Sequence, residues 1–231
     1  MMPECGESES MDSWKSGLWY HLNFSWIWAT YTLGFSYRSR GFYHMPKTGP
    51  VLILANHESY LDPLAVGLAV RRRIRYLARK PLFHPPVLGP YLKSVGCVPV
   101  DQQGVAKEGI RTCIDLLRAG KPLLVFPEGR RTADGKLQEF KAGIALILKH
   151  VPVPIVPVGI AGAYESYPIH ATVPKFCPMF WPYNGAAIAT SVGKPILPEQ
   201  YQKMERGEML RFVSDAVVAE VEQAERIKRK G

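Results

Sequence analysis

Short apolar runs, each followed at once by a polar cluster, alternate along this chain with longer segments that have helical features. The length and apolar content of buried strands are found in residues 51–55, 122–126, 153–160 and 186–192. Helical spacing, helix-starting prolines or helix-ending glycines mark residues 62–70, 104–118, 142–149 and 207–228. Strands that alternate with helices predict an α/β fold, with a mostly parallel or mixed central sheet flanked by helices.

Two details refine the expected sheet. Pro154 and Pro157 interrupt the run 153–160, and because proline is mostly confined to edge strands and bulges, we predict an edge or bulged position there. Residues 96–101 read as one more short strand, with Asp101 at its end. Ligand sites in such sheets lie beyond the carboxyl ends of the strands, which is where the polar clusters of this sequence fall.

An aromatic segment without charged side chains precedes the first of these strands. Residues 16–37 contain no Asp, Glu, Lys or Arg, and eight of these 22 residues are Trp, Tyr or Phe. A membrane span needs about 20 apolar residues, and polar side chains such as His21 and Asn23 make this segment too hydrophilic. Because Trp and Tyr favour the headgroup level, we predict a helix lying in a membrane interface. The alternative is a helix packed on the protein's own core.

The remaining composition sets the domain organisation and the class of partner. A chain of 231 residues suits one core, so we assign residues 1–40 to an N-terminal membrane-associating helical segment and residues 41–231 to one α/β domain. The net charge of +9 favours anionic partners such as phospholipid headgroups. Four cysteines without a CxxC pair predict reduced thiols, not a disulfide framework or a zinc site.

A histidine and an aspartate five residues apart follow the strand 51–55. On a continuous helix, His57 and Asp62 would lie about 140° apart and would not meet. With His57 in a loop and Asp62 in the first helical turn, the carboxylate can hold one ring nitrogen while the other accepts a proton from a bound hydroxyl. The alternative is that His57 caps the helix and Asp62 is a surface residue. No metal site is predicted, because no second histidine accompanies His57 at helical spacing.

A second polar cluster follows the strand 122–126 and has the character of an anion site. Gly129 permits a sharp turn, and the adjacent Arg130 and Arg131 offer planar donors suited to phosphate. We expect Glu128 to hold a substrate hydroxyl or one of these arginines. Lys141 adds another cation nearby in sequence. The alternative is a solvated basic loop.

Taken together, four ordered motifs resemble those of the glycerophospholipid acyltransferase family, which includes the 1-acylglycerol-3-phosphate acyltransferases. The family's N-H-x-x-x-x-D block is matched by Asn56, His57 and Asp62. Its second block, an apolar strand between Gly and Asp-Arg, is matched by Gly96, Val98, Val100 and Asp101. Its F-P-E-G-T-R-S block is matched by Phe126, Pro127, Glu128, Gly129 and Arg131, with Thr132 in the Ser place. Residues 153–158 match its V-P-I-V-P-V block.

The resemblance implies an O-acyltransferase of phospholipid biosynthesis at the cytoplasmic face of a membrane, with residues 41–231 as the acyltransferase domain. The expected reaction moves a fatty acyl group from acyl-CoA or acyl-carrier protein, a co-substrate used without a cofactor, to a lysophospholipid hydroxyl. With 1-acylglycerol 3-phosphate as acceptor, the product is phosphatidic acid. His57 would act as general base and Asp62 would orient it, while Glu128 and Arg131 match acceptor-binding positions. Asp101 is included among the substrate-binding residues.

Two departures from the family pattern leave the acceptor open. Gln102 stands where the family has an arginine, and Arg130 stands where it has a threonine. One hypothesis is that Arg130 restores the lost charge from another loop. The other is that the acceptor lacks a terminal phosphate, as another lysolipid or a lyso-amino-lipid would.

A basic run supports a rival of a different class. Residues 71–80 hold six Arg or Lys side chains, which would attract anionic lipid or the phosphates of CoA, or simply form a solvated helix end. This run favours the alternative of a non-catalytic basic membrane-binding module. Nucleic acid is not an expected partner, because the aromatic residues cluster at the N-terminus, apart in sequence from the basic runs.

Overall fold

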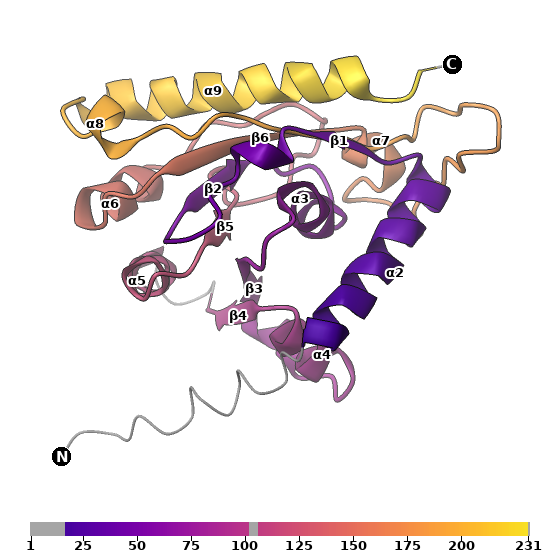
Figure 1. Cartoon of the computed structure of the whole chain (residues 1–231), viewed down its shortest axis with the longest axis horizontal. Helices are drawn as coiled ribbons and strands as arrows, with labels where there is room; N and C mark the ends of the chain where they lie inside the picture. The colour runs from indigo at the N-terminus through magenta and orange to yellow at the C-terminus, as the bar shows by residue number, and fades with distance from the viewer. Residues whose placement is uncertain (1–16, 102–105, 231) are drawn as a thin grey trace.

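The computed structural model describes residues 17–101 and 106–230, which form one seven-stranded sheet with helices on both faces (Figure 1). The strands are β1 (Arg38–Arg40), β2 (Leu52–Ala55), β3 (Arg75–Arg79), β4 (Cys97–Val100), β5 (Leu123–Val125), β6 (Ile155–Ala161) and β7 (Ala189–Val192). The helices are α2 (Gly17–Phe35), α3 (Asp62–Val70), α4 (Leu88–Ser94), α5 (Ala106–Arg118), α6 (Gly143–His150), α7 (Ala163–Ser166), α8 (Pro198–Tyr201) and α9 (Arg206–Ile227). Two short turns of 3-10 helix are η1 (Phe42–His44) and η2 (Lys80–Phe83).

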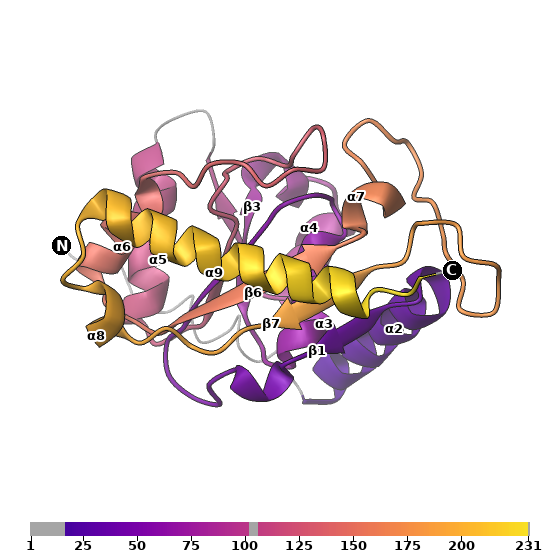
Figure 2. The same ribbon diagram turned by 90° about the horizontal axis from the view of Figure 1, so that it is seen from above.

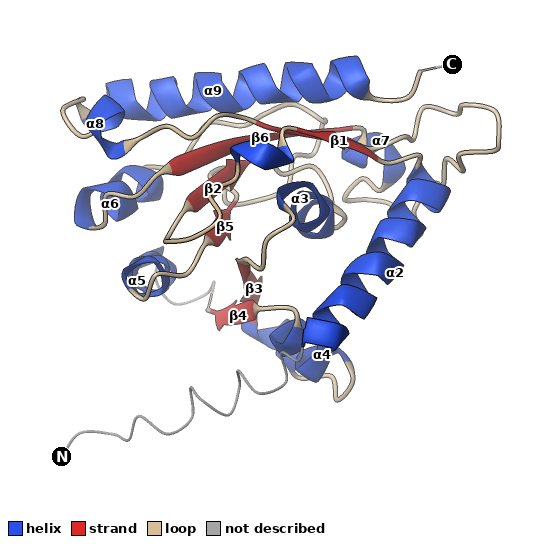
Figure 3. Cartoon of the chain, in the orientation of Figure 1, coloured by secondary structure: helices blue, strands red, loops and turns tan. Residues whose placement is uncertain are grey.

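The sheet is mixed and mostly parallel, which confirms the predicted fold class. Its strand order is β1-β7-β6-β2-β5-β3-β4. Neighbouring strands run parallel except for β6 and β7, which pair antiparallel. Figure 3 shows the strands as the central layer between helices. β1, at residues 38–40, already belongs to this sheet through its pairing with β7, so the sheet begins before the predicted domain start at residue 41.

The central strands are apolar at every position because both faces of the sheet are covered. Leu52 and Leu54 of β2 pack in the cluster formed with α5, α6 and α9. Val51, Ile53 and Ala55, one step out of phase, pack in the cluster that contains α3. All five are fully buried, as expected for a parallel strand between two helical layers. Figure 2 shows α9 lying along β6 and β7.

The predicted edge position of the strand 153–160 is wrong, but the alternative, a bulged position, is borne out by its pairing. β6 lies inside the sheet, with β2 on one side and β7 on the other. Ile155 pairs antiparallel with Ile196, and Val158 pairs with Val192, so two residues of β6 (156–157) face three residues of the returning chain (193–195). The carbonyl of Pro157 accepts a bond from the N–H of Gly193 within this bulge. The N–H that Pro157 lacks would point to this same side. An interior strand tolerates the proline here because the missing donor falls at this interruption of the ladder.

The aromatic segment forms α2, and one side of it belongs to the core. Tyr31 and Phe35 are buried, and the hydroxyl of Tyr31 donates to the carbonyl of Leu61 at 2.8 Å. The outward side exposes a series of large apolar side chains: Leu18, Trp19, Leu22, Trp26 and Leu33. Trp28 is also exposed. No described helix is both long and apolar enough to cross a membrane. The predicted interfacial position of α2 stays a prediction.

The basic run 71–80 is not a solvated helix end. α3 ends at Val70, its C-cap residue Arg71 lies in the left-handed region with φ of 49°, and the chain then enters β3, an interior strand. Arg72 donates to the carbonyls of Pro46 at 2.8 Å and Gly49 at 2.6 Å. The guanidinium of Arg73 lies 4.6 Å from the ring centre of Tyr20 on α2. These cations fasten the segment before β2 and the start of α2 to the domain.

Candidate active site

The polar clusters predicted from the sequence gather along one edge of the sheet. β2, β5, β3 and β4 are neighbours and run parallel, so their carboxyl ends lie at the same edge. His57 follows β2, Glu128 follows β5, Lys80 follows β3 and Asp101 follows β4. This is the edge where ligand sites of open α/β sheets form.

His57 and Asp62 are in direct contact. The Nδ1 of His57 donates to the Oδ2 of Asp62 at 2.8 Å. The same oxygen accepts the backbone N–H groups of Glu58 at 2.6 Å and Ser59 at 2.7 Å. Asp62 is the first residue of α3 and is fully buried, so the alternative of a surface aspartate is wrong. The loop folds back over the first helical turn, and that fold brings residues five apart face to face.

Phe126 and the backbone fix the plane of the His57 ring. The two rings stack with centroids 3.9 Å apart and planes within 12°. The N–H of His57 donates to Glu128 Oε1 at 2.7 Å, and its carbonyl accepts the N–H of Thr132 at 2.9 Å. With Nδ1 committed to Asp62, Nε2 is directed away from it, on a side chain that is 19% exposed. That nitrogen is placed to accept a proton.

Burial dominates the electrostatics of the three carboxyl groups around His57. It raises the pKa of Asp62, and the hydrogen bond from His57 opposes this shift. Burial, followed by the charge of Asp62, raises the pKa of Glu58 well above its ordinary value. Burial also raises the pKa of Glu128. Carboxylates in such surroundings favour a nearby positive charge, so Asp62 would stabilise an imidazolium formed at His57.

Glu128 acts as a strut between two loops. Its Oε1 accepts the N–H of His57, and its Oε2 accepts the N–H of Gln138 at 2.9 Å. The side chain is only 2% exposed. Both oxygens therefore accept hydrogen bonds from the backbone. The predicted pairing of Glu128 with a neighbouring arginine is not seen in the described part of the chain.

The neighbouring loop presents cations beside this strut. The guanidinium of Arg131 stacks on Tyr60, 3.4 Å from the ring centre, and its Nη1 is buried with no hydrogen-bond partner among the described residues. Arg130 is exposed. Gly129 has φ of +70°, and a Cβ there would lie 2.8 Å from Nζ of Lys141. Lys141 thus lies across the turn, and a buried guanidinium nitrogen without a partner suits an anionic ligand.

Asp101 is not brought to His57. β4 lies three strands from β2 in the sheet order, roughly 14 Å at the usual strand spacing. Its carboxylate is 41% exposed and lies 3.6 Å from Nζ of Lys80. Gln102 lies outside the described residues. In the ranges 17–101 and 106–230, no group of three or more His, Cys, Asp or Glu could hold a metal ion.

Sequence reasoning assigned no roles to several residues that shape the site. The side-chain amide of Asn56 bonds both backbone groups of Ile160, at 2.8 and 2.9 Å, and so ties the end of β2 to β6. Ser59 Oγ donates to the carbonyl of Tyr167 at 2.8 Å. Asn56 could have been found from its place in the N-H-x-x-x-x-D block. Tyr167 is 108 residues from Ser59 and carried no signal in the sequence.

Comparisons with known proteins agree with this geometry. The family model described as Acyltransferase matches residues 37–161. A chloroplastic 1-acyl-sn-glycerol-3-phosphate acyltransferase of Brassica napus is 27% identical over 154 residues, covering 64% of this chain and 44% of that protein. The 1-acyl-sn-glycerol-3-phosphate acyltransferase of Bacillus subtilis is 29% identical over 120 residues, covering 52% of this chain and 59% of that protein. The chain thus spans about half the length of these curated relatives.

A solved structure shares the fold. The crystal structure of the 1-acyl-sn-glycerophosphate acyltransferase PlsC from Thermotoga maritima superposes with a TM-score of 0.71. The match covers 96% of this chain and 81% of that one, at 23% sequence identity. At this identity the likeness establishes the architecture of the sheet and its helices.

Proposed function

Because the chain belongs to the acyltransferase family, we propose that it transfers a fatty acyl group to the hydroxyl of a lysophospholipid at a membrane surface. The preferred acceptor is 1-acylglycerol 3-phosphate, and the product is phosphatidic acid. The observation that carries this proposal is the 2.8 Å contact between His57 and a fully buried Asp62 at the carboxyl edge of the sheet. The names of the curated relatives support the choice of acceptor.

In this mechanism, His57 Nε2 takes the proton of the acceptor hydroxyl as its oxygen attacks the thioester carbonyl carbon. The new ester C–O bond forms, the C–S bond breaks, and the thiol leaves with the proton that His57 returns. The bond from Nδ1 to Asp62 holds the ring in place and stabilises its transient positive charge. The substrate supplies the hydroxyl that a serine supplies in a catalytic triad, so no covalent acyl-enzyme forms.

The acceptor phosphate is placed against the cations of the loop after β5. Arg131 has a buried nitrogen without a partner among the described residues, and exposed Arg130 and Lys141 flank the same turn. Planar guanidiniums match the geometry of phosphate oxygens. Glu128 supports this loop through its two backbone bonds without needing to contact substrate. The acyl donor is acyl-CoA or acyl-carrier protein.

The enzyme works at the cytoplasmic face of a membrane, where both kinds of donor and the lipid acceptor meet. The outward side of α2 supplies the contact, since Trp26 is 74% exposed and Leu18 is 69% exposed on it. Trp favours the headgroup level of a bilayer. The net charge of +9 suits anionic headgroups.

Acyl transfer by the purified protein in detergent tests the proposal. Acyl-CoA and acyl-carrier protein are each offered with lysophosphatidic acid, lysophosphatidylcholine or a lyso-amino-lipid. We expect phosphatidic acid as the main product, its loss in His57→Ala, and its retention in the control His150→Ala, an exposed histidine on α6. Folded, lipid-bound protein that makes no product from any pair would leave the non-catalytic membrane-binding module as the function.

The same set of acceptors also tests whether Arg130 binds the acceptor phosphate in place of the arginine that the family has at position 102. If Arg130 compensates for Gln102, Arg130→Ala raises KM for lysophosphatidic acid and leaves KM for the acyl donor unchanged. Activity restricted to acceptors without a terminal phosphate monoester would contradict this compensation and support the second candidate, acylation of another lysolipid.

A further inference from the structure

The segment between α7 and β7, residues 167–187, carries a group of strongly exposed apolar side chains. Phe180 is 85% exposed, Val173 73% and Trp181 68%, and Phe176 and Met179 are exposed by 52% and 40%. Large exposed apolar patches on a folded protein mark surfaces that bind a partner or a membrane. We call this segment the 167–187 loop.

The loop is held in place by the end of α2. The N–H of Cys177 donates to the carbonyl of Gly34 at 2.8 Å, and the hydroxyl of Ser36 donates to the carbonyl of Cys177 at 2.8 Å. The rings of Phe35 and Phe176 stack with centroids 5.1 Å apart. Cys177 itself is fully buried. The exposed side chains are therefore presented from a fixed backbone.

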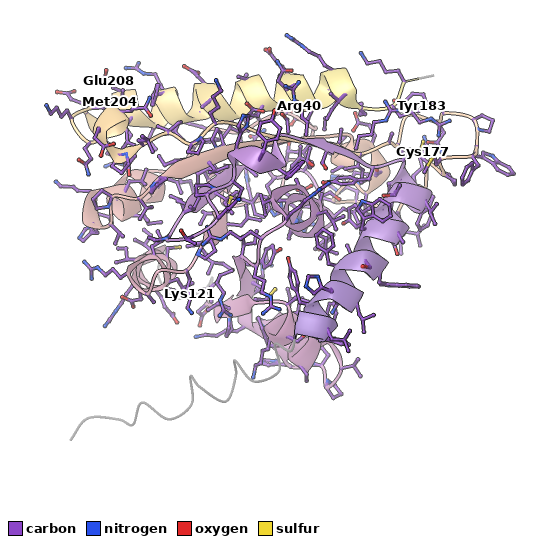
Figure 4. The ribbon with its side chains drawn as sticks, in the orientation of Figure 1. Arg40, Lys121, Cys177, Tyr183, Met204 and Glu208 are labelled. Atoms are coloured by element: carbon purple, nitrogen blue, oxygen red, sulfur yellow. The ribbon has the colours of Figure 1, made fainter. Side chains whose placement is uncertain are left out.

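The residue after the α9 C-cap adds a second attachment. The guanidinium of Arg229 donates to the carbonyls of Pro178 at 2.9 Å and Trp181 at 2.7 Å, and to the hydroxyl of Ser36 at 3.0 Å. One arginine thus joins the chain beyond α9, the loop and the end of α2. Figure 4 shows Cys177 and Tyr183 of the loop beside the end of α2, at the opposite end of α9 from Met204 and Glu208.

The apolar surface of the loop continues onto α2. The N–H of Met179 donates to the carbonyl of Leu33 at 3.2 Å, and Leu33 is itself 52% exposed. Further along α2, Trp26 and Leu22 are exposed by 74% and 58%. Loop and helix therefore form one surface at one end of the molecule, far from α8 (Figure 1).

The charge of this surface suits an anionic partner. Residues 167–198 contain no Asp or Glu. Lys175 lies within the loop and Lys230 follows Arg229 at the end of the chain, and both are exposed. Aromatic side chains flanked by cations are the combination that binds the headgroup region of anionic bilayers.

The loop also begins at the catalytic site. The carbonyl of Tyr167, its first residue, accepts the hydroxyl of Ser59 in the loop that holds His57. The rings of Tyr167 and Tyr60 lie 5.7 Å apart. Tyr167 therefore links the loop, and any lipid surface that the loop binds, to the segment that carries His57.

We infer that the 167–187 loop is a second membrane-docking element, which inserts Phe180 and Trp181 into the headgroup interface of an anionic bilayer beside α2. This inference rests on the proposed membrane function and extends it to a site outside the N-terminal segment. The docked loop and α2 would hold the carboxyl edge of the sheet at the lipid surface that supplies the acceptor.

Vesicle partitioning of the full chain tests the inference without any acyl donor or acceptor. The vesicles contain phosphatidylglycerol and phosphatidylcholine in a ratio of about 3:7, so that anionic headgroups are present. We expect Phe180→Ser/Trp181→Ser to lower the partition coefficient by roughly tenfold or more, because two large side chains no longer leave water. The control is Tyr43→Ser/Leu197→Ser, which removes side chains exposed by 69% and 49% on η1 and before α8.

Equal partitioning of wild type and the loop variant would overturn the inference, as would an equal loss in the control variant. Weaker self-association of the loop variant without any change in vesicle binding would show instead that the loop contacts a second copy of the chain. Thermal unfolding of each variant confirms that the fold is retained. Because no turnover is measured, failure of the acyltransferase proposal leaves this result interpretable.

Discussion

At the scale of single residues, the site depends on how a few buried carboxyl groups are satisfied. Oδ2 of Asp62 accepts bonds from His57 and from two backbone N–H groups, whereas Oδ1 is buried with no partner among the described residues. Both carboxylate oxygens of Glu128 accept backbone N–H groups, those of His57 and Gln138. Acidic residues from two motifs of one family therefore have different roles: Asp62 holds the proposed base, and Glu128 joins the loops that carry His57 and Gln138.

Asp62→Asn is expected to abolish most activity while leaving the fold intact. The amide oxygen can occupy the Oδ2 position and the NH₂ group the Oδ1 position, where no bond to a described residue is lost. Without a negative charge beside the ring, His57 becomes a poorer base, so we expect kcat/KM to fall by at least about 10²-fold. Steady-state acyl transfer measures this, with Asp115→Asn, exposed on α5, as control. Full activity in Asp62→Asn would remove Asp62 from the mechanism.

Glu58 is expected to impose a pH dependence on stability. Because its pKa is raised above the ordinary 4.5, the folded protein keeps this proton at pH values where the unfolded chain has released it. The stabilisation is complete below pH 4.5 and is lost as pH rises toward the folded pKa, at up to about 1.4 kcal/mol per pH unit. Urea unfolding of wild type and Glu58→Gln at a series of pH values from 4.5 upward measures how steeply the free energy of unfolding falls with pH.

The amide side chain introduced by Glu58→Gln cannot titrate, so the free energy of unfolding of this variant should fall less steeply with pH. The decline that remains would come from Asp62 and Glu128, whose pKa values are also raised. Glu222→Gln, an exposed residue on α9, is the matched control and should follow the wild type. Identical slopes in Glu58→Gln and wild type would contradict the prediction.

At the scale of elements, the interior of the sheet depends on how closely α9 approaches β6. Gly159 lies in the middle of β6, and a Cβ there would overlap the backbone of Glu220 and Val221 on α9. The small side chains of Ala161, Ala189 and Ala224 form a buried cluster nearby. Small residues let the helix lie directly on the strands, which explains how a single helix covers both β6 and β7.

Gly159→Ala is expected to destabilise the fold by about 3 kcal/mol or more, because the methyl group must push α9 away from the sheet. Gly109→Ala in α5 is the matched change, since a Cβ there meets nothing within 4 Å. It should raise stability by about 1 kcal/mol through helix propensity. Chemical unfolding of both variants tests the contrast, and similar stability changes would show that α9 tolerates a shift.

At the scale of the whole molecule, charge and apolar exposure point to the same partner. The net charge is +9, while α2 and the 167–187 loop expose aromatic side chains at one end of the molecule. Electrostatic attraction would bring the protein to an anionic bilayer, and apolar contact would keep it there. These two contributions respond differently to salt.

Binding to anionic vesicles should weaken with added salt but should not disappear. At an ionic strength of about 1 M the screening length falls to about 3 Å, which removes most of the attraction between exposed charges. The apolar contribution remains under these conditions. Co-sedimentation across a salt series, with neutral vesicles as reference, separates the two. Binding that vanishes completely at high salt would contradict a role for the exposed aromatic side chains.

Local patterns in the sequence were enough to predict the α/β class and most of the secondary structure. Alternating apolar strands and helices are such patterns, and the strand-terminal position of His57 and Glu128 follows from them. The contact between His57 and Asp62 was predictable because only six residues and one helix start are involved. The resemblance of four ordered motifs was enough to predict the family that residues 37–161 match.

Which distant residues meet depended on the folded chain. The strand order put β6 inside the sheet despite its prolines and left Asp101 at a far edge, because pairing depends on crossovers that local sequence does not specify. The same is true of Tyr167 beside the loop that carries His57 and of Arg229 holding the 167–187 loop against α2. Such contacts join segments that lie far apart in the sequence. They stabilise the protein only after the intervening chain has folded, so no local pattern encodes them.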